Sequence, residues 1–457
     1  MNDKANLILS KLRTNGHSAF IVGGAVRDLL IGKEPKDFDI VSSAAPADIK
    51  EIFKGFQILE IGEAFGIVSV VIDGEPFEIA QMRKDSKGSD GRRPDFVTPV
   101  NSIGEDLARR DFTMNAIAMI NEHEFIDPFG GSRDIEDKII DFVGDAAERI
   151  NEDKLRILRA FRFMSQLGFN FSIRTHKAIE KFFDNGGGFN SISQERITAE
   201  FNKILTGKNA FNTVRLLAEM KILEHIIPET YRLFEPHDNK WHTEELAPFG
   251  TAIISHVLHV FKAATEFECE NVLALRLAAL LHDIAKPVCR GQNKYGQSNF
   301  HGHDLKGAEI TFCILTRMKF PNDLIDLVVS MVRHHMNMHD ITKMKKDYKI
   351  RRLLGRKDFD MLLALGICDT TGTAAENGVP NHEEATKLLQ TVVMLREKFP
   401  DMLPDPIITG KDLIFEGKKP GPEFKDILFK THNFQLNGET DRNKLLKFAM
   451  GLFNNVG

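Results

Sequence analysis

Cysteine is scarce in this chain, with four among 457 residues. The four are too scattered to form the close pairs of a metal site or the framework of a disulfide-stabilised protein. Apolar runs are also short, well below the roughly 20 residues that cross a bilayer, and the N-terminus lacks the basic-then-apolar pattern of a secretory signal. We therefore expect a cytoplasmic protein with no membrane segment. The cysteines are Cys269, Cys289, Cys313 and Cys368.

An excess of basic residues is absent too, since the formal net charge is −5. This total argues weakly against nucleic acid as a partner, but it says little where basic residues cluster on one face. They cluster in three stretches, 83–110, 156–162 and 343–357. For the third stretch, a solvated protein surface is as good an explanation as a surface that binds nucleic acid. The third stretch contains Lys343, Lys345, Lys346, Lys349, Arg351, Arg352, Arg356 and Lys357.

The sequence pattern changes near residue 140. Before it, strand-like apolar runs alternate with short helices and glycine turns, whereas after it helical periods continue almost everywhere. This order predicts an α+β protein, with a mixed head followed by a long helical part. Breaks near 186–188, 236–239 and 400–406 predict boundaries within the helical part. The expected strands cover 20–23, 38–41, 66–72, 77–81 and 116–120.

A glycine turn leads from the first expected strand into a helix, in the segment Ile21-Val22-Gly23-Gly24-Ala25-Val26-Arg27-Asp28. Glycine lets backbone N–H groups approach an anion closely, and a helix N-terminus favours negative charge. Arg27, about one turn inside the helix, can then reach a phosphate. Tight turns of this kind also need glycine for steric reasons alone, so the motif by itself is weak support for a phosphate site.

Asp37 and Asp39 follow on the next expected strand, where residues two apart point to the same face. Two carboxylates held close together repel each other unless a cation lies between them. Hard oxygen ligands at this spacing suit Mg²⁺, with nucleotide phosphates completing its shell. Two such ions activate an attacking hydroxyl and stabilise a leaving pyrophosphate. A solvated strand edge explains the pair equally well when it stands alone, but not beside the glycine turn. Glu78, on a later strand, is a candidate third carboxylate.

Residues 152–163 predict an amphipathic helix in which arginines recur every three positions. Because a helix has about 3.6 residues per turn, Asp153 and Arg156 are expected to be close neighbours, whereas Arg162 lies well round from Asp153. Ordinary i,i+3 ion pairing is the alternative interpretation.

A carboxylate beside a guanidinium offers an acceptor next to donors. Cytosine and adenine present the complement, an amino donor beside a ring-nitrogen acceptor, whereas uracil and guanine present a carbonyl oxygen and a ring N–H. Buried groups left unpaired cost about 1–3 kcal/mol each. Asp153 and Arg156 are therefore predicted to accept CTP and ATP and to refuse UTP and GTP without a template. Arg159 and Arg162 are candidates for triphosphate or further base contacts.

Taken together, these motifs resemble the class II tRNA nucleotidyltransferase and bacterial poly(A) polymerase family. The resemblance covers about the first 230 residues, with the motifs in the family's order. The motifs are Val22-Gly23-Gly24-Ala25-Val26-Arg27-Asp28, Lys36-Asp37-Phe38-Asp39, Arg92-Arg93-Pro94, Arg109-Arg110-Asp111-Phe112-Thr113-Met114-Asn115-Ala116, Asp127-Pro128-Phe129-Gly130-Gly131 and Glu152-Asp153 with Arg156, Arg159 and Arg162-Phe163.

The resemblance implies a polymerase-β-like nucleotidyltransferase head over 1–140, then a helical neck and body over 141–234. An HD-type helical domain over 235–375 and a helical tail over 376–457, in contact with tRNA, are expected to follow. The family has a flexible loop, needed for adding the terminal A, where this chain has residues 83–93, and its full length here favours an enzyme that adds A.

By position, the resemblance also implies roles for individual residues. Gly24 and Arg27 match phosphate-binding residues, and Asp37 and Asp39 match the Mg²⁺ ligands. The implied nucleotide-binding set consists of Arg110, Asp153, Arg156, Arg159 and Arg162.

A second motif lies in the helical half, where Leu277–Leu281 leads into His282-Asp283 and resembles the signature of the HD superfamily. An apolar helix that ends in His-Asp places two ligands where a metal can reach them. The remaining candidate ligands are His256, His303, either His334 or His335, and Asp369. Imidazoles mixed with carboxylates suit Mn²⁺, Ni²⁺, Fe²⁺ or Zn²⁺, and a hydroxide on such a metal can hydrolyse a phosphate ester.

Three functions therefore remain in play at this point. The first is addition of C and A from CTP and ATP to the 3′ end of tRNA, or of the final A alone. The second is poly(A) polymerase activity, which shares the head. The third is a metal phosphohydrolase whose head only binds RNA; loss of Asp37 or Asp39 would support it, and both are present.

Overall fold

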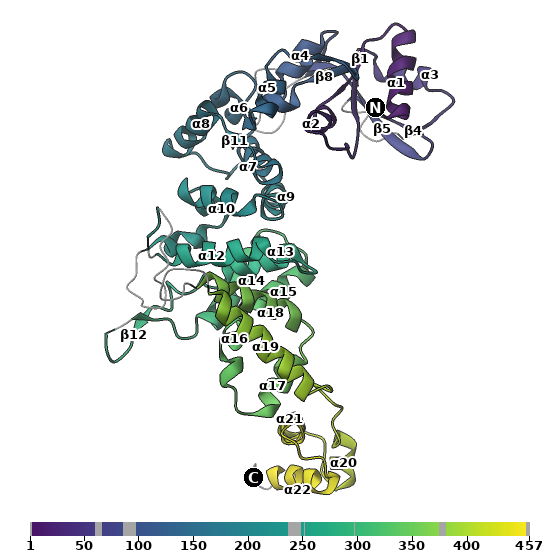
Figure 1. Ribbon diagram of the computed structural model, residues 1–457. Helices are drawn as coiled ribbons and strands as arrows, with labels where there is room; N and C mark the ends of the chain where they lie inside the picture. Colours follow the sequence, from purple (N-terminus) through teal and green to yellow (C-terminus); the bar gives the residue numbers. More distant parts are fainter. Residues whose placement is uncertain are drawn as a thin grey trace. The chain divides into compact units, whose positions relative to one another are not determined.

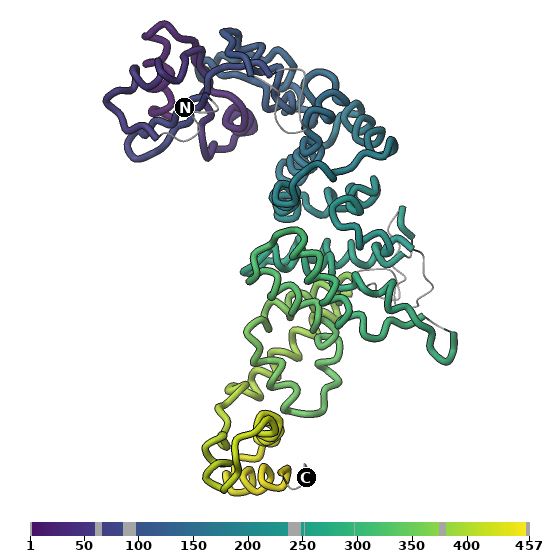
Figure 2. The backbone as a smooth tube through the Cα atoms, turned by 180° about the vertical axis from the view of Figure 1, so that it is seen from behind, coloured from purple at the N-terminus to yellow at the C-terminus, as the bar shows by residue number. Residues whose placement is uncertain are grey.

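The computed structural model describes residues 2–59, 66–85, 97–235, 248–250, 252–296, 298–373 and 381–453. The chain divides into two compact units, Met1–Ile226 and Ile227–Gly457. Each unit consists of one continuous stretch of chain, purple to teal in the first and teal to yellow in the second (Figures 1 and 2). The mixed α/β class and the order of head before helical part are confirmed.

The first unit begins with a seven-stranded sheet in the order β3-β4-β5-β2-β1-β8-β9. All five expected strands are present, although their ends differ by one to a few residues. Among the described strands of this sheet, β2 and β5 form the parallel pair and the other pairs are antiparallel. The strands are β1 Ala19–Val22, β2 Asp39–Ser42, β3 Gln57–Leu59, β4 Ile67–Ile72, β5 Glu75–Gln81, β8 Ala118–Asn121 and β9 Glu124–Ile126.

Apolar residues of the central strands set the register of the sheet. Strand β1 is buried along almost its whole length, and β2 is buried from Ile40 onward. Antiparallel pairing opposes Val22 to Asp39, so the turn after β1 lies beside the first residue of β2. The core below these strands includes Met82, Leu107 and Val143. The helices and small strands of the head are α1 Asp3–Thr14, α2 Gly24–Leu30, α3 Pro46–Ile52, α4 Ile103–Ala108, α5 Gly131–Glu136, β6 Arg83–Asp85 and β7 Val97–Pro99.

A set of helices completes the first unit. Helix α7 buries Leu155, Leu158 and Phe161, which are the apolar positions expected from its periodicity, and it packs against α9. The helical part is interrupted by the short parallel pair of β10 and β11, which the sequence pattern did not predict. The elements are β10 Ile139–Ile140, α6 Ala146–Glu152, α7 Leu155–Leu167, β11 Asn170–Phe171, α8 Ile173–Asp184, α9 Gln194–Leu205, α10 Ala210–Glu219 and α11 Leu223–Ile226.

Among its described residues, the second unit consists of helices and one small hairpin of Gly291–Gln292 (β12) and Ser298–Asn299 (β13). Helices α12, α13 and α18 are buried over most of their residues and pack on one another. The helices are α12 Ile253–Glu266, α13 Val272–Leu281, α14 His303–Arg317, α15 Asn322–His334, α16 Met336–Asp340, α17 Asp347–Leu354, α18 Phe359–Gly372, α19 His382–Lys398, α20 Gly410–Phe415, α21 Glu423–Leu436 and α22 Arg442–Phe453.

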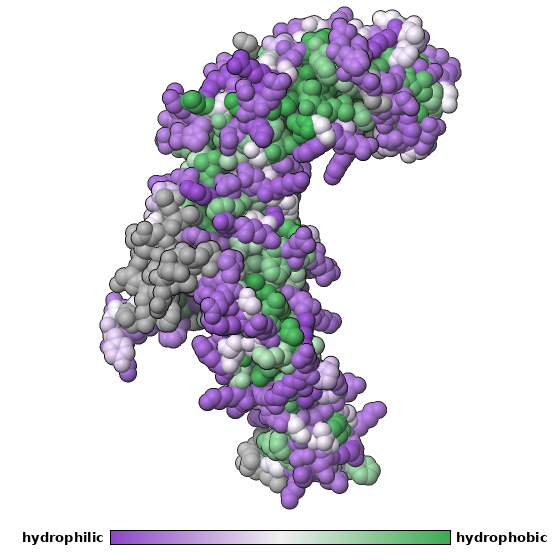
Figure 3. All heavy atoms as spheres, viewed as in Figure 1, coloured by the Kyte–Doolittle hydropathy of each residue, from purple (hydrophilic) through white to green (hydrophobic). Residues whose placement is uncertain are grey.

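Hydrophilic side chains cover most of the molecular surface in the view of Figure 3. Within the described ranges, no helix is long and apolar enough to cross a membrane.

Two expectations about local structure are wrong. The single helix expected over 152–163 is interrupted: α6 ends at Glu152, Asp153 is extended with φ −150° and ψ 104°, and α7 begins at Leu155. The physical reason is a local hydrogen bond, because the Asp153 carboxylate accepts from the backbone N–H of Leu155 at 3.0 Å, and such side-chain to backbone bonds compete with a continuous helix. Strand β2 also begins at Asp39, so Asp37 precedes the strand.

Candidate functional site

Three carboxylates gather at the edge where β2 begins. Parallel pairing of Ile40 with Ile79 places the preceding residues, Asp39 and Glu78, side by side, and both are exposed. Partial shielding from water raises the pKa of the Asp39 carboxyl group. The negative charges of Asp37 and Glu78 raise this pKa further, and the positive charge of Arg110 lowers it. Carboxylates whose negative charges repel in this way fit a bound cation, because the cation removes the repulsion.

The glycine turn lies against this carboxylate cluster. Gly23 has a φ of +73°, which glycine adopts without steric cost. A Cβ atom added at Gly23 would lie 3.3 Å from Oδ2 of Asp39 and 3.1 Å from Nη1 of Arg110. Helix α2 starts at Gly24, and Arg27 donates from Nη1 to Oδ1 of Asn115 at 2.8 Å. The turn thus brings backbone, carboxylate and guanidinium groups together.

Arg110 is held by a carboxylate that the sequence argument did not single out. Asp106 is fully buried, and its two oxygens accept hydrogen bonds from Arg109 at 2.7 Å and from Arg110 at 3.2 Å. Burial lowers the pKa of Arg110. The spacing of three and four residues from Asp106 to the two arginines is a signal that could have revealed this support.

A cavity of about 290 Å³ adjoins Arg110 within the first unit. Four of the five predicted nucleotide-binding residues line it, although they come from separate segments of the chain. The cavity is lined by Asp85, Arg109, Arg110, Asp111, Asp153, Leu155, Arg156, Arg159 and Arg196. The fifth, Arg162, is not among these described lining residues; it donates to Oε1 of Glu200 at 3.1 Å.

The charged groups of this cavity have partners that the helix period did not predict. Asp153 accepts from Nη2 of Arg196 at 2.8 Å, so α9 supplies its guanidinium neighbour. Arg156 donates to Oε2 of Glu152 at 2.6 Å. Arg159 donates from Nε to Oδ2 of Asp111 at 2.8 Å, and this charge raises the pKa of Arg159. Asp153 and Arg156 both line this cavity, but each is held by another partner.

The loop predicted near the head site lies only partly within the described residues. The motif Arg92-Arg93-Pro94 and most of the loop expected over 83–93 lie outside the described residues. At its start, Arg83–Asp85 forms strand β6, paired with β7.

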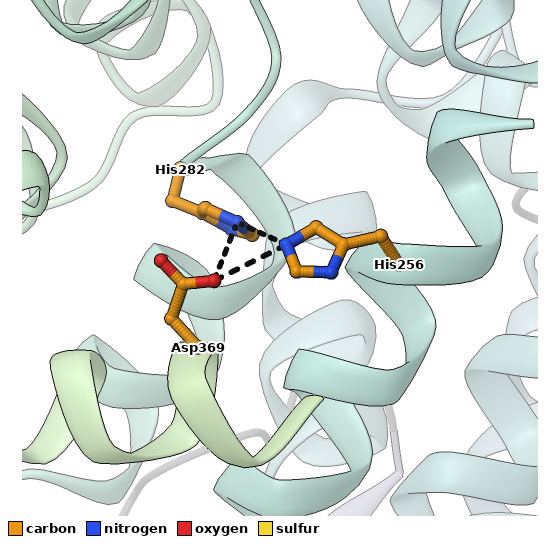
Figure 4. A group of neighbouring side chains, drawn as sticks. All are labelled: His256, His282 and Asp369. Carbon is orange, nitrogen blue, oxygen red and sulfur yellow. Dashed lines mark hydrogen bonds and ion pairs between the residues drawn. The ribbon is translucent and has the colours of Figure 1, made fainter. Parts of the chain in front are cut away.

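The second unit brings together the histidines and aspartates predicted from the HD-type motif. His256 on α12, His282 at the end of α13 and Asp369 on α18 point toward one another (Figure 4). The Nε2 atom of His256 lies 3.3 Å from Nε2 of His282 and 3.2 Å from Oδ1 of Asp369. Such separations suit atoms arranged around one ion at about 2.1 Å.

A second group of possible ligands adjoins the first. It consists of Asp283, His303 and His335, all buried. Asp283 joins the two groups, because Oδ2 lies 3.2 Å from Nε2 of His282 and Oδ1 lies 3.3 Å from Nε2 of His303. Of the two alternatives left by the sequence, His335 belongs to the group, whereas His334 is not part of either group among the described residues.

Backbone carbonyls orient three of these rings in the same way. Nδ1 of His282, His303 and His335 lies 2.7–2.9 Å from the carbonyl oxygen three residues earlier. A carbonyl can only accept, so each Nδ1 carries the proton and Nε2 keeps its lone pair for a metal. Two further residues, not predicted, approach the aspartates: Lys286 contacts Asp283 at 2.5 Å and His339 contacts Asp369 at 2.8 Å.

The electrostatics keep this centre ready for a cation. Burial lowers the pKa of His335 to about 3, so its ring is neutral. Burial alone would raise the pKa of Asp283, but the charges of His282 and Lys286 outweigh it and hold that pKa well below the usual range. Burial alone would lower the pKa of His282, but the charges of Asp283 and Asp369 outweigh it and raise that pKa. Transition metals bind neutral imidazoles and ionised carboxylates, so metal binding here requires loss of the extra proton from His282.

Comparison with protein families matches three parts of the chain. Residues 19–141 match the poly A polymerase head domain, and residues 168–233 match the "Probable RNA and SrmB-binding site of polymerase A". Residues 253–385 match the HD domain. The matched segments thus combine a poly A polymerase head domain with an HD domain in one chain.

Proteins similar to this chain in sequence and in structure include CCA-adding enzymes. The CCA-adding enzyme of Bacillus mycoides is 46% identical over 223 residues, which are 49% of this chain and 55% of that protein. The chain thus spans about half the length of the curated relatives that it matches. The Bacillus stearothermophilus CCA-adding enzyme in complex with CTP is 27% identical, covers 99% of this chain and 98% of its own, and has a TM-score of 0.62. The Thermotoga maritima CCA-adding enzyme complexed with tRNA, 20% identical with a TM-score of 0.64, shares the fold. The first half of the chain is thus similar in sequence to CCA-adding enzymes, and residues 19–141 match the poly A polymerase head domain.

Proposed function

We propose that this protein adds C and A nucleotides from CTP and ATP to the 3′ end of tRNA, and so builds or repairs the terminal CCA without a template. The observation that carries the proposal is the position of Arg110. It lies beside Asp39 at the glycine turn and also lines the cavity that contains Asp153 and Arg156. Arg110 therefore connects the cavity, where we propose that the base binds, with the carboxylate cluster. Similarity to CCA-adding enzymes supports the same substrates.

The site residues receive separate roles in this proposal. Asp37 and Asp39 hold Mg²⁺ and are the catalytic carboxylates, with Glu78 beside them. When bound, Mg²⁺ supplies activation of the attacking hydroxyl and charge stabilisation for the leaving pyrophosphate. The backbone at Gly24 and the guanidinium of Arg27 bind the triphosphate.

Base selection is assigned to the cavity. Asp153 accepts the amino group shared by cytosine and adenine, and Arg156 donates to the neighbouring ring nitrogen. Their partners Arg196 and Glu152 hold both side chains in place before the nucleotide binds, so little conformational entropy is lost on binding. Arg110 and Arg159, in the cavity wall, and Arg162, beside it in sequence on α7, serve the triphosphate or further base contacts.

The proposed domain division follows the same assignment. The head over 1–140 performs the transfer, and the neck and body over 141–234 select the nucleotide and bind RNA. The HD-type domain over 235–375 and the tail over 376–457 follow, with the tail in contact with tRNA. Because the proposed substrates are tRNA, CTP and ATP, we place the reaction in the cytoplasm.

Extension of three tRNA transcripts, ending before CCA, after C and after CC, tests this function. Each is incubated with CTP, ATP or both in the presence of Mg²⁺. Addition of C, C and A followed by a stop is expected. Addition of A to the CC-ended transcript alone would identify an A-adding enzyme, and unlimited A addition to any RNA would identify a poly(A) polymerase. No incorporation on any transcript would refute the proposal.

A second activity is favoured by the two ligand groups joined through Asp283. We propose that this centre binds Mn²⁺, Ni²⁺, Fe²⁺ or Zn²⁺ and hydrolyses phosphate esters. The ligands would be His256, His282, Asp283, His303 and Asp369, together with His335. Hydrolysis of a chromogenic phosphomonoester and a phosphodiester, measured with each metal after chelation, tests it; no hydrolysis with any metal would show a silent site.

A further inference from the structure

A strongly basic cavity of about 670 Å³ lies in the second unit, between the end of α15 and the start of α17. Six of its twelve lining residues are lysine or arginine and one is aspartate. We call it the basic pocket, and it is lined by His334, Asn337, Asp340, Lys343, Met344, Lys345, Lys346, Tyr348, Lys349, Arg352, Leu353 and Arg356. It contains much of the third basic stretch, which the sequence alone could not assign to either a solvated surface or a surface that binds nucleic acid.

The charge of the basic pocket is largely uncompensated. Lys343, Lys345, Lys346 and Lys349 are exposed, and none of them forms an ion pair within the described part of the chain. Arg356 alone in the pocket pairs with a carboxylate there, that of Asp358 at 2.9 Å. This cluster of positive charges occurs in a chain whose net charge is −5. Positive charges held close together repel one another unless an anion binds between them.

Some exposed lysines elsewhere in the same unit are paired. Lys306 pairs with Glu309 at 2.8 Å, Lys387 with Glu384 at 2.8 Å, and Lys430 with Asp426 at 2.6 Å. Others, such as Lys319 and Lys425, are exposed and form no ion pair within the described part of the chain. The basic pocket differs because it gathers four such lysines and two arginines in one cavity.

The wall of the pocket is fixed by contacts behind it. Arg352 donates from Nε to Oδ1 of Asn433 at 2.6 Å and lies 4.2 Å from the ring centroid of Phe429. Arg356 donates to the hydroxyl of Ser330 at 2.6 Å. Two guanidiniums held in place behind a rim of four lysines provide a site that needs little reorganisation on binding.

We propose that the basic pocket binds the phosphate backbone of the RNA substrate, at a distance in the chain from the nucleotide-transfer residues. Its cations are spread over 343–356 within an open cavity, which suits several phosphates along one strand better than a single small anion. The proposal rests on the proposed function, which makes RNA the substrate. It adds a second, sequence-independent contact that positions the RNA and contributes to its affinity.

The test replaces Lys343, Lys346 and Lys349 together by alanine in the full-length protein. The matched control replaces Lys306, Lys387 and Lys430, which changes the net charge equally but removes lysines that are already paired. Affinity for a tRNA transcript is measured by fluorescence anisotropy at several salt concentrations. Because each phosphate contact contributes about 0.7–0.9 to the slope of log K against log salt, K343A/K346A/K349A is expected to lower that slope by about 2 and to weaken binding by about 10- to 100-fold near 0.15 M salt. The control is expected to change neither.

Other outcomes overturn the proposal. Equal losses in both triple variants would show a general effect of net charge, and an unchanged slope in K343A/K346A/K349A would show that the pocket does not bind RNA. Loss of tripolyphosphate binding with tRNA binding unchanged would show a site for a free anion. Nucleotide addition is followed in the same unmodified protein, so its absence refutes the proposed function while the RNA-binding comparison still tests the pocket.

Discussion

At the scale of single residues, the cavity of the first unit shows that an ionic partner is chosen by the fold rather than by sequence spacing. Asp153 and Arg156 are three residues apart, yet Asp153 pairs with Arg196 of α9 and Arg156 pairs with Glu152. Each partner fixes the direction of one side chain, so a base that enters the cavity meets an acceptor and a donor already in position.

Replacement of Arg156 by alanine is expected to weaken discrimination against UTP. Loss of one donor removes about 1–3 kcal/mol of selection, or about a 5- to 150-fold change in the ratio of kcat/KM for CTP to that for UTP. Steady-state incorporation on a transcript that lacks CCA provides the measurement. Arg149→Ala is the control, because Arg149 also pairs with Glu152 but is not among the described residues that line the cavity. Unchanged discrimination in Arg156→Ala would remove the base-reading role.

Asp111 links acidity to the stability of the first unit. It is buried, and against the effect of burial the charge of Arg159 holds its pKa below the usual value. The folded protein therefore binds this proton less readily than the unfolded chain. The stabilisation is fully present above the unfolded pKa of about 3.9 and is lost as the pH falls toward the folded pKa.

Asp111→Asn is therefore expected to lower the free energy of unfolding at pH 7 by about 2–3 kcal/mol. The value lies below that of a fully buried pair because about a third of the Arg159 side chain, 34%, is exposed. Urea unfolding at pH 7 and at a pH well below the unfolded pKa of about 3.9 provides the measurement. The difference between the two proteins should narrow at the lower pH, and a difference that stayed constant would contradict the assigned ion pair.

At the scale of elements, the site depends on one strand–turn–helix unit held by a pairing between strands. Burial of β1 and β2 sets the register that opposes Val22 to Asp39. A slip by one residue would turn every side chain of the strand to the other face, so the apolar core of the head positions the carboxylates.

Gly23→Ala is expected to reduce the rate of nucleotide incorporation at least tenfold. The new Cβ atom would lie 3.1 Å from Arg110 and 3.3 Å from Asp39, and so would displace them. A displacement of reacting groups by about 1 Å can lower a reaction rate by up to about 100-fold. Gly32→Ala is the matched control. Gly32 has the same φ of +73°, but a Cβ atom added there would have no heavy atom within 4 Å. Both variants should lose about 1 kcal/mol of stability from backbone strain, which thermal unfolding measures. Equal activity in the two would show that the close approach is unimportant.

At the scale of the whole molecule, two candidate centres lie in two separate units, Met1–Ile226 and Ile227–Gly457. The head carboxylates are oxygen ligands beside a glycine turn, whereas the HD-type centre mixes imidazoles with carboxylates. The two donor sets favour different metals, so the activities should be separable.

Asp39→Ala is expected to abolish nucleotide incorporation while leaving tRNA binding nearly intact and phosphate-ester hydrolysis unchanged. Asp283→Asn, a substitution of similar volume, is expected to abolish hydrolysis while leaving incorporation within about twofold of the parent. Both activities are measured on each variant. Incorporation retained by Asp39→Ala would refute the metal assignment in the head, and hydrolysis retained by Asp283→Asn would refute the joined centre.

Sequence alone determined the class of fold, the five main strands of the head, and which residue types supply the chemistry. These features follow from short-range regularities, namely the periods of two and 3.6 residues, glycine at a tight turn, and carboxylates or histidines in compact motifs. Asp39 and Arg156 were found in this way, whereas the roles of Arg110 and His282 came from resemblance to known families.

Only the tertiary structure decided which of these groups meet and which partners hold them. It joined Asp283 to both histidine groups, chose His335 over His334, and supplied Arg196 and Asp106 as supporting residues. It also ended one helix at Glu152, where the Asp153 side chain accepts a hydrogen bond from the backbone N–H of Leu155. The physical reason is that ion pairs and ligand sets depend on distances between segments far apart in the chain, and those distances are set by the packing of the core rather than by any local pattern.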